Sequence, residues 1–267
     1  MNYSTSHLPG PGLPGQNGGA PIPADRREFK FLVDVEVRDR MLPDIATRLL
    51  VDPHSDEDGA YHVATVYYDS AERDVYWERS RHVIPRHKLR LRRYGDGLLT
   101  DAACFVEIKT RLRRRVVKRR LPVSVEEGLA LCSGVALPGS FQPADKSVID
   151  DVLGLVSLRD LQPACLVRYR RQAFVGAENL RLTFDSGLTY RIQRPTVLSD
   201  TTAEGALLPA EQVVMEIKVA DAVPTWLATL VARHGGVLRR FSKYCQAVEV
   251  AGLLDQPLPH SEAVTLG

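Results

Sequence analysis

The sequence predicts an α+β protein built around an antiparallel β-sheet of about seven or eight strands, with helices beside it. Two observations predict this class. Short runs that alternate apolar with charged residues recur along the chain, as in HKLRLRRYG (87–95), and such alternation is typical of strands whose two faces differ. Many of these runs are separated by turns short enough for antiparallel pairing. The letters G-x-G-x-x-G occur only at 10–15, in a segment rich in proline and glycine that follows no expected strand, and no P-loop occurs, so no nucleotide-binding signature can be claimed.

The first half of the chain opens with a strand and a helix. Charged and apolar residues alternate in REFKFLV (27–33), whereas EVRDRMLPDIATRLL (36–50) spaces its apolar residues as a helix does, with Pro43 early in the main helix. The next expected elements are a turn-rich loop at 52–60, a strand at 61–69, a short helix at 70–80, a strand at 87–95, a turn at Gly95 and Gly97, and strands at 104–112 and 116–124.

The second half combines longer strands with further helices. Helical spacing predicts a helix over 144–160, and PTWLATLVARHGG (224–236) has proline at its start and glycine at its end, as helices prefer. Strands are expected at 165–175, 180–192 and 211–220, before segment 241–250 closes the domain. Residues 1–24, rich in proline, glycine, serine and asparagine, are expected to form a disordered tail and 253–267 a flexible one, which leaves one domain at 25–252.

The charge of the chain is small in sum but uneven along the sequence. The formal net charge of +2 argues against a protein that coats nucleic acid over its whole surface, yet residues 86–120 hold 13 of the 35 lysines and arginines. Such a concentration can focus a positive field. The four cysteines form no C-x-x-C pair and are expected as small buried residues in a reducing cytoplasm. No apolar run reaches the length of a membrane-spanning helix.

Several strands carry charge on one face only. In the strand 87–95, Lys88, Arg90 and Arg92 share a face opposite Leu89 and Leu91. One interpretation is a sheet with a core face and a solvated face. The other is a closed barrel that packs apolar residues outward against helices and encloses a polar lumen. Like charges that face one another across a lumen repel, so such a barrel favours an anionic ligand or bound ions.

Short motifs that follow one another along the chain support the second interpretation. They are E-x-K (28–30), K-x-R-x-R (88–92), V-E-I-K-T (106–110) with VKRR (117–120), R-Q-A-F (171–174), R-L-T-F-D (181–185), M-E-I-K (215–218) and F-S-K-Y (241–244). In this order they resemble the polyphosphate polymerase domain of the vacuolar transporter chaperone (VTC) family, within the CYTH or triphosphate tunnel metalloenzyme superfamily. The resemblance covers about residues 25–250.

This resemblance implies an antiparallel β tunnel barrel of about eight strands with peripheral helices. It also implies a polyphosphate polymerase that transfers the ATP γ-phosphate to a growing chain with Mn²⁺ or Mg²⁺. The residues at matching motif positions are the catalytic phosphate clamps Arg90, Arg92, Lys109, Arg171 and Arg181, the substrate-binding residues Lys30, Lys88, Lys118, Tyr169, Lys218, Ser242 and Lys243, and the metal ligand Glu216. Arginine forks suit phosphate oxygens, and a carboxylate suits these hard cations.

Other charged residues have no assigned role in the motifs. Glu28 and Glu107 either assist the metal or neutralise neighbouring cations, and Arg93, Arg168 and Arg170 are expected on the outer surface. Arg113 and Arg114 are expected in a solvated hairpin. Many relatives in the wider superfamily have a carboxylate where this chain has Arg26. Fewer acids should favour a phosphate chain end as acceptor over activated water, so polymer is expected from ATP with little free phosphate.

Alternative functions remain open at this stage. They are a non-catalytic polyphosphate-binding module, a metal-dependent triphosphatase on the same fold, and a nucleic-acid binder. The last is disfavoured because the basic run RLRRRVVKRR (111–120) has no aromatic residue for base stacking. The sequence also lacks the inositol-phosphate-sensing domain and membrane helices of the eukaryotic assembly. We therefore expect a bacterial, cytoplasmic domain with ATP and polyphosphate as partners. A separate membrane protein would export its product.

Overall fold

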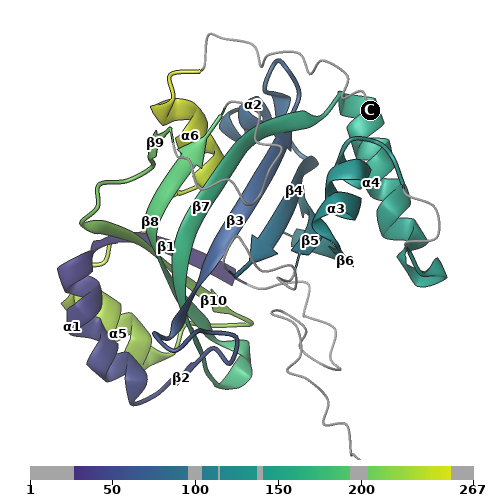
Figure 1. The fold of residues 1–267 in the computed structure, drawn as a ribbon. Coiled ribbons are helices and arrows are strands. Elements are labelled where there is room, and N and C mark those ends of the chain that lie inside the picture. Colours follow the sequence, from purple (N-terminus) through teal and green to yellow (C-terminus); the bar gives the residue numbers. More distant parts are fainter. Residues whose placement is uncertain (1–26, 96–103, 114, 137–140, 193–203, 254–267) are drawn as a thin grey trace, which may run out of the picture.

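The computed structural model describes residues 27–95, 104–113, 115–136, 141–192 and 204–253 (Figure 1). Several expectations fall on other residues. The tail 1–24, nearly all of the tail 253–267, Arg26, Gly97 and Arg114 lie outside the described part of the chain.

One antiparallel sheet of ten strands forms the centre of the described chain. The strands are β1 (Arg27–Asp34), β2 (Leu50–Val51), β3 (Ala60–Asp69), β4 (Arg86–Tyr94), β5 (Cys104–Leu112), β6 (Arg115–Val123), β7 (Gln162–Val175), β8 (Arg181–Arg191), β9 (Gly205–Ala206) and β10 (Gln212–Val219). Their order is β1-β10-β8-β7-β3-β4-β5-β6, with β2 paired to β7 and β9 to β8. The predicted α+β class with an antiparallel sheet is confirmed, although among the described residues β1 and β6 do not pair to close it.

Six α-helices accompany the sheet in the described residues. They are α1 (Val35–Ala46), α2 (Asp74–Ser80), α3 (Val125–Cys132), α4 (Lys146–Arg159), α5 (Thr225–Arg233) and α6 (Lys243–Val250), and single 3₁₀ turns occur at Pro143–Asp145 and Ala177–Asn179. The prediction for α1 is wrong at its end, because Leu50 and Val51 pair with β7 as β2. Pro43 consequently lies near the end of the helix and not early in it.

Helix α3 was not predicted, although the sequence holds a signal for it. Ser124 precedes the helix, and its side-chain oxygen accepts a hydrogen bond of 3.0 Å from the Glu127 backbone N–H. The Glu127 carboxylate accepts one of 2.7 Å from the Ser124 N–H in return. This reciprocal pair is a capping box. The spacing S-x-x-E before an apolar run predicts such a helix N-terminus.

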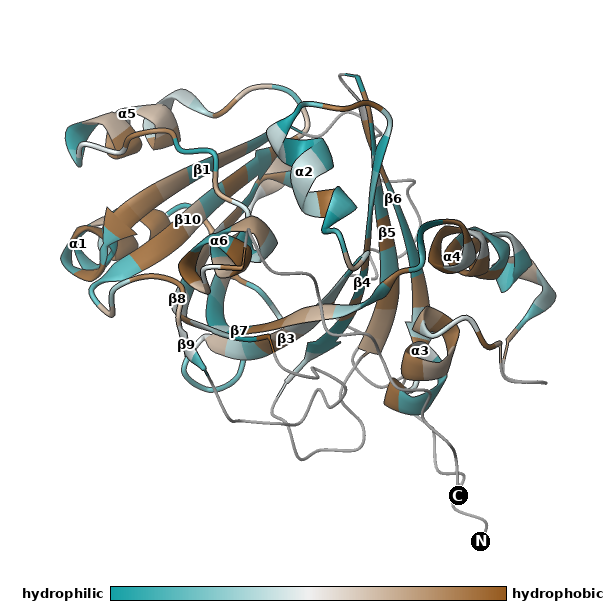
Figure 2. Cartoon of the chain, turned by 90° about the horizontal axis from the view of Figure 1, so that it is seen from above, coloured by the Kyte–Doolittle hydropathy of each residue, from teal (hydrophilic) through white to brown (hydrophobic). Residues whose placement is uncertain are grey.

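Helices α1, α3 and α5 cover parts of the apolar face of the sheet. On one half, α1 and α5 lie side by side over β8 and β10 (Figures 1 and 2), where Leu182 and Met215 belong to the same core cluster as Ile45 and Leu227. On the other half, α3 packs against β4 so closely that a Cβ at Gly128 would lie 2.4 Å from a Leu91 methyl carbon. All four cysteines are buried and unbonded, as expected.

The opposite face of the sheet carries the alternating charges and is called the interior face below. Seen from above, the sheet curls so that strands far apart in its order approach one another, with α6 near the middle (Figure 2). A contact between β5 and β1 demonstrates this curl, because Lys109 Nζ lies 3.3 Å from Glu28 Oε2. The charged faces of the strands are therefore turned toward a shared interior and do not form an ordinary solvated surface.

Candidate functional site: a cationic interior with paired carboxylates

Strand pairing aligns charged residues in rows across β1, β10 and β8. Lys30 of β1 is opposite Glu216 of β10, which is in turn opposite Thr183 of β8. In the next row, Glu28 is opposite Lys218, and Lys218 is opposite Arg181. Because alternate residues of a strand share a face, both rows lie on the interior face.

The carboxylates of Glu28 and Glu216 are both held by lysines. Lys30 Nζ lies 2.9 Å from Glu28 Oε1 and 3.5 Å from Glu216 Oε2, and Lys218 Nζ lies 2.5 Å from Glu216 Oε1. Burial and the nearby Glu216 raise the pKa of Glu28, but Lys30, Lys218 and Lys109 outweigh them and hold it at about 2. Burial also raises the pKa of Glu216, but Lys218 and Lys30 bring it well below its usual range. Both carboxylates are ionised at neutral pH.

Asp185 forms the second cluster and connects α6 to the sheet. Arg171 of β7 donates two hydrogen bonds to its carboxylate, at 2.6 and 2.8 Å, and Lys243, the first residue of α6, donates one at 2.6 Å. Burial raises the pKa of Asp185, but Arg171 and Lys243 outweigh this effect and hold the pKa at about 2. The ring of Tyr169 stacks against both cations, with 5.2 Å to the Arg171 guanidinium and 4.5 Å to Lys243 Nζ.

Glu107 forms the third and most crowded cluster. Its side chain is 1% exposed and has four cations within 4 Å. The shortest contacts to its oxygens are 2.6 Å from Arg90, 3.9 Å from Arg92, 2.5 Å from Lys118 and 2.5 Å from Arg120. Burial raises the pKa of Glu107, but Arg90, Arg92 and Lys118 bring it well below the usual range. One carboxylate cannot neutralise four cations, so this cluster is strongly positive.

Further contacts hold the remaining predicted residues at the interior. Lys88 Nζ lies 3.4 Å from the Ser242 hydroxyl, which joins β4 to the N-terminus of α6. Arg92 Nε donates to Thr65 Oγ1 at 3.1 Å. Arg181 is engaged by Asp52 and also donates a hydrogen bond of 2.9 Å to the Tyr61 hydroxyl.

All predicted site residues therefore lie on the interior face or at the N-terminus of α6. Sequence reasoning gave no site role to Arg120, Asp52, Thr65 or Asp185, which the structure places among them. Arg120 could have been found, because it is in phase with Lys118 on β6. Asp52 and Thr65 gave no such signal, since their partners are far away in the sequence. Glu107 contacts the neighbouring cations, which is the geometry that one of its two expected roles requires.

Expectations for the other arginines are met in part. The Arg170 guanidinium lies on the outer side, 2.8 Å from a carboxylate oxygen of exposed Asp58, and Arg113 is exposed in the β5–β6 turn. Arg168 is half-buried. The prediction for Arg93 is wrong, because its side chain is buried under the elements that cover the apolar face, where only 6% of the residue is exposed.

The residues near Lys30 fit a divalent cation that arrives with its phosphate. No cluster of three or more potential metal-ligating side chains occurs in the described ranges. Glu28 and Glu216 nevertheless provide two ionised carboxylates that share Lys30 as a partner. Mg²⁺ is often bound by one or two carboxylates together with substrate phosphates. The donor set thus suits a hard cation whose other ligands come from the substrate.

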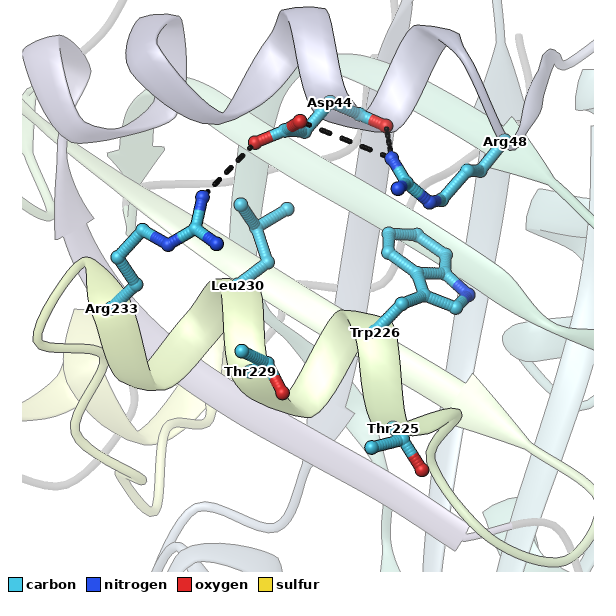
Figure 3. Close-up of a pocket in the computed structure, with 7 residues that line it drawn as sticks. All are labelled: Asp44, Arg48, Thr225, Trp226, Thr229, Leu230 and Arg233. Atoms are coloured by element: carbon cyan, nitrogen blue, oxygen red, sulfur yellow. Dashed lines mark hydrogen bonds and ion pairs between the residues drawn. The ribbon is translucent and has the colours of Figure 1, made fainter.

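A small pocket elsewhere has a different character. It lies between α1 and α5, on the outer side of the sheet, and is lined in part by Arg48, Trp226 and Arg233 (Figure 3). Asp44 lies 3.9 Å from the Arg48 guanidinium and 3.7 Å from that of Arg233, so both cations already have an anionic partner. Arg48 also stacks on Trp226 at 5.3 Å. The interior face is therefore the better candidate site.

Comparison of the sequence with protein-family models identifies the family of this chain. The VTC domain model matches residues 25–251. This chain belongs to the VTC domain family. None of the curated proteins matches the sequence. Within the described part of this VTC domain, no helix is both long and apolar enough to cross a membrane.

The solved structures that match this VTC domain share little sequence with it. A candidate adenylyl cyclase from Hippeastrum with a dominant triphosphatase activity is 15% identical, with a TM-score of 0.49 over 86% of this chain and 98% of that one. A Pyrococcus horikoshii protein is 12% identical, with a TM-score of 0.45 over 86% of this chain and 99% of that one. A candidate adenylate cyclase from Bacillus halodurans is 14% identical, with a TM-score of 0.42 over 90% and 97%. The family assignment rests on the sequence match.

Proposed function

We propose that this VTC domain is a polyphosphate polymerase, which transfers the γ-phosphate of ATP to a polyphosphate chain bound at the interior face. The observation that carries the proposal is the cluster of Arg90, Arg92, Lys118 and Arg120 around the single carboxylate of Glu107. Gathering like charges in this way is unfavourable unless an anion with several charges binds them. A phosphate chain carries such charges at regular spacing.

The interior residues suit phosphoryl transfer, which depends mainly on positioning and on stabilising charge. Arg90 and Arg171 would bind phosphate oxygens with their planar forks, and Lys243 would add charge from α6. Glu216 and Glu28 would hold a divalent cation, Mn²⁺ or Mg²⁺, which stabilises the charge that develops on the transferred phosphate when bound. The buried carboxylates Glu107 and Asp185 would keep the cations in place before the substrate binds.

Incubation of the protein with ATP and Mn²⁺ tests this proposal. Gel analysis should show a long anionic polymer, while ADP forms with little free phosphate at early times. Release of mainly orthophosphate from ATP or tripolyphosphate, before polymer accumulates, would contradict polymerisation and support a triphosphatase.

A second candidate is a polyphosphate-binding module without catalysis. It is favoured by one observation: Glu216, the candidate metal ligand, is already engaged by Lys218 at 2.5 Å and by Lys30 at 3.5 Å. If these lysines keep the carboxylate from a metal, the interior would bind polyphosphate without turnover. Tight binding of tripolyphosphate with no ADP formed from ATP, in either Mn²⁺ or Mg²⁺, would support this alternative.

A further inference from the structure

One buried hydroxyl on the interior face has no hydrogen-bond partner within the described part of the chain. It belongs to Thr183 of β8, of which 1% is exposed. A buried hydroxyl without a partner destabilises the folded state, and native proteins keep few such groups. Valine has nearly the same shape and would avoid this loss. A threonine here therefore requires an explanation beyond packing.

The cross-strand neighbours of Thr183 make no hydrogen bond to its hydroxyl. Strand pairing places the residue between Ala173 of β7 and Glu216 of β10. Ala173 has no polar side-chain atom, and the oxygens of Glu216 are engaged by Lys218 and Lys30. Along β8 the flanking interior residues are Arg181 and Asp185, and each is paired with other partners. The hydroxyl thus lies beside the candidate metal ligand, among cations, and is hydrogen-bonded to no acceptor of the described residues.

We propose that Thr183 is a further substrate-binding residue, whose hydroxyl donates a hydrogen bond to an oxygen of the phosphate group bound beside Glu216. This inference rests on the proposed role of the interior as a phosphate site. Lysines attract a phosphate from many directions, whereas a hydroxyl on a β-branched side chain in a strand donates from a fixed position. Tyr169 of β7 also has a buried hydroxyl without a partner in the described chain, so the interior holds neutral donors among its cations.

The test is Thr183→Val, which removes the hydroxyl and keeps the shape. Affinity for tripolyphosphate is measured by calorimetry in EDTA, and the melting temperature is measured without ligand. The affinity should fall about tenfold to a hundredfold, because a hydrogen bond to a charged acceptor is lost. The melting temperature should be unchanged or higher, since no internal hydrogen bond is broken. Thr183→Ser should restore most of the affinity.

Thr189→Val is the matched control. Thr189 lies on the same strand, but it is opposite Arg168 and Ala206 on the other face of the sheet. This variant should leave affinity unchanged. Equal affinity of Thr183→Val and wild type would overturn the inference, as would an affinity loss that occurs only with Mn²⁺. A wild-type protein that fails to bind tripolyphosphate would overturn both the inference and the proposed function.

The two proposals can also fail separately. Suppose that wild type binds tripolyphosphate but forms no polymer from ATP, while Thr183→Val binds it more weakly. The polymerase proposal would then be overturned and the binding role of Thr183 supported. If wild type forms polymer and Thr183→Val binds as tightly as wild type, only the inference about Thr183 would be overturned.

Discussion

Arg90 on β4 is directly opposite Glu107 on β5, and its Nε and Nη2 both lie 2.6 Å from one oxygen of the Glu107 carboxylate. Lys118 and Arg120 of β6 reach the other oxygen. The carboxylate therefore fixes three arginine or lysine side chains from two neighbouring strands. Glu107 is better explained as the group that spaces these cations than as a metal ligand, because they already engage both of its oxygens.

We predict that Glu107→Gln destabilises the folded protein but makes it respond more strongly to a polyanion. Removing one partner of a buried ion pair typically costs about 3–5 kcal/mol, since the remaining charges lose their compensation. Tripolyphosphate can supply the missing negative charge, so it should raise the melting temperature of the variant more than that of wild type. Thermal and urea unfolding with and without tripolyphosphate measure both effects.

The control for this variant is Glu36→Gln on α1. The Glu36 side chain is 88% exposed and lies 3.8 Å from Arg40, so the same substitution there should change stability by less than about 1 kcal/mol. If Glu107→Gln is as stable as Glu36→Gln, Glu107 does not hold the cluster together.

The neighbours Arg170 and Arg171 provide a second test, because they lie on opposite faces of β7. Arg171→Ala removes the arginine that binds Asp185 at the interior, whereas Arg170→Ala removes one that pairs with exposed Asp58 outside. Loss of a charge-assisted contact of about 1.5–3 kcal/mol should weaken tripolyphosphate binding by roughly tenfold or more for Arg171→Ala. Arg170→Ala should change affinity by less than about threefold. Equal effects in calorimetry at one salt concentration would show that the ligand does not bind at the interior face.

Glu216→Gln should separate catalysis from binding. The amide is a poor ligand for a hard divalent cation, so metal-dependent formation of ADP from ATP should be lost. Tripolyphosphate should still bind in EDTA at least as tightly as to wild type, because Lys218 and Lys30 remain and a negative charge is gone. Glu211→Gln, at an exposed position just before β10, is the control and should keep full activity. If Glu216→Gln forms ADP as fast as the wild-type protein, this carboxylate has no role in the mechanism.

The titration of Lys118 should make the affinity for tripolyphosphate depend on pH. Although 38% of its side chain is exposed, its Nζ lies 2.5 Å from buried Glu107. Burial, Arg90 and Arg120 together lower the pKa of Lys118 to about 7, in spite of the opposite effect of Glu107. A bound anion would raise this pKa, so binding should take up a proton, and affinity should fall as the pH rises above 7.

Lys118→Arg keeps its charge at these pH values and should remove this part of the pH dependence. The titration of tripolyphosphate itself is common to both proteins and cancels in the comparison. Calorimetry between about pH 6 and 9 measures affinity and proton uptake. The same shift has the opposite sign for stability. Between pH 7 and the ordinary lysine pKa of 10.5 the unfolded chain binds more protons, so the contribution of Lys118 to stability rises with pH. Identical pH profiles for the two proteins would contradict the assignment.

Local patterns in the sequence were sufficient to predict most of the strands. The alternation in K-x-R-x-R and M-E-I-K places Arg90 and Glu216 on a charged face, because a strand repeats every two residues whatever it pairs with. The same rule could have included Arg120. At the end of α1, pairing overrode local preference: Leu50 fits the helical spacing but forms β2 against β7.

The sequence by itself determined which residues share a face, and its motif order indicated the VTC family. Only the tertiary structure decided which charges meet. Asp185 is far from Lys243 in the sequence, and Asp52 is far from Arg181, so no local period could predict that they form ion pairs. The curl of the sheet and the position of α6 bring these groups together. Each carboxylate then has a depressed pKa or a fixed partner because of the cations that surround it, and these neighbours are a property of the folded chain as a whole.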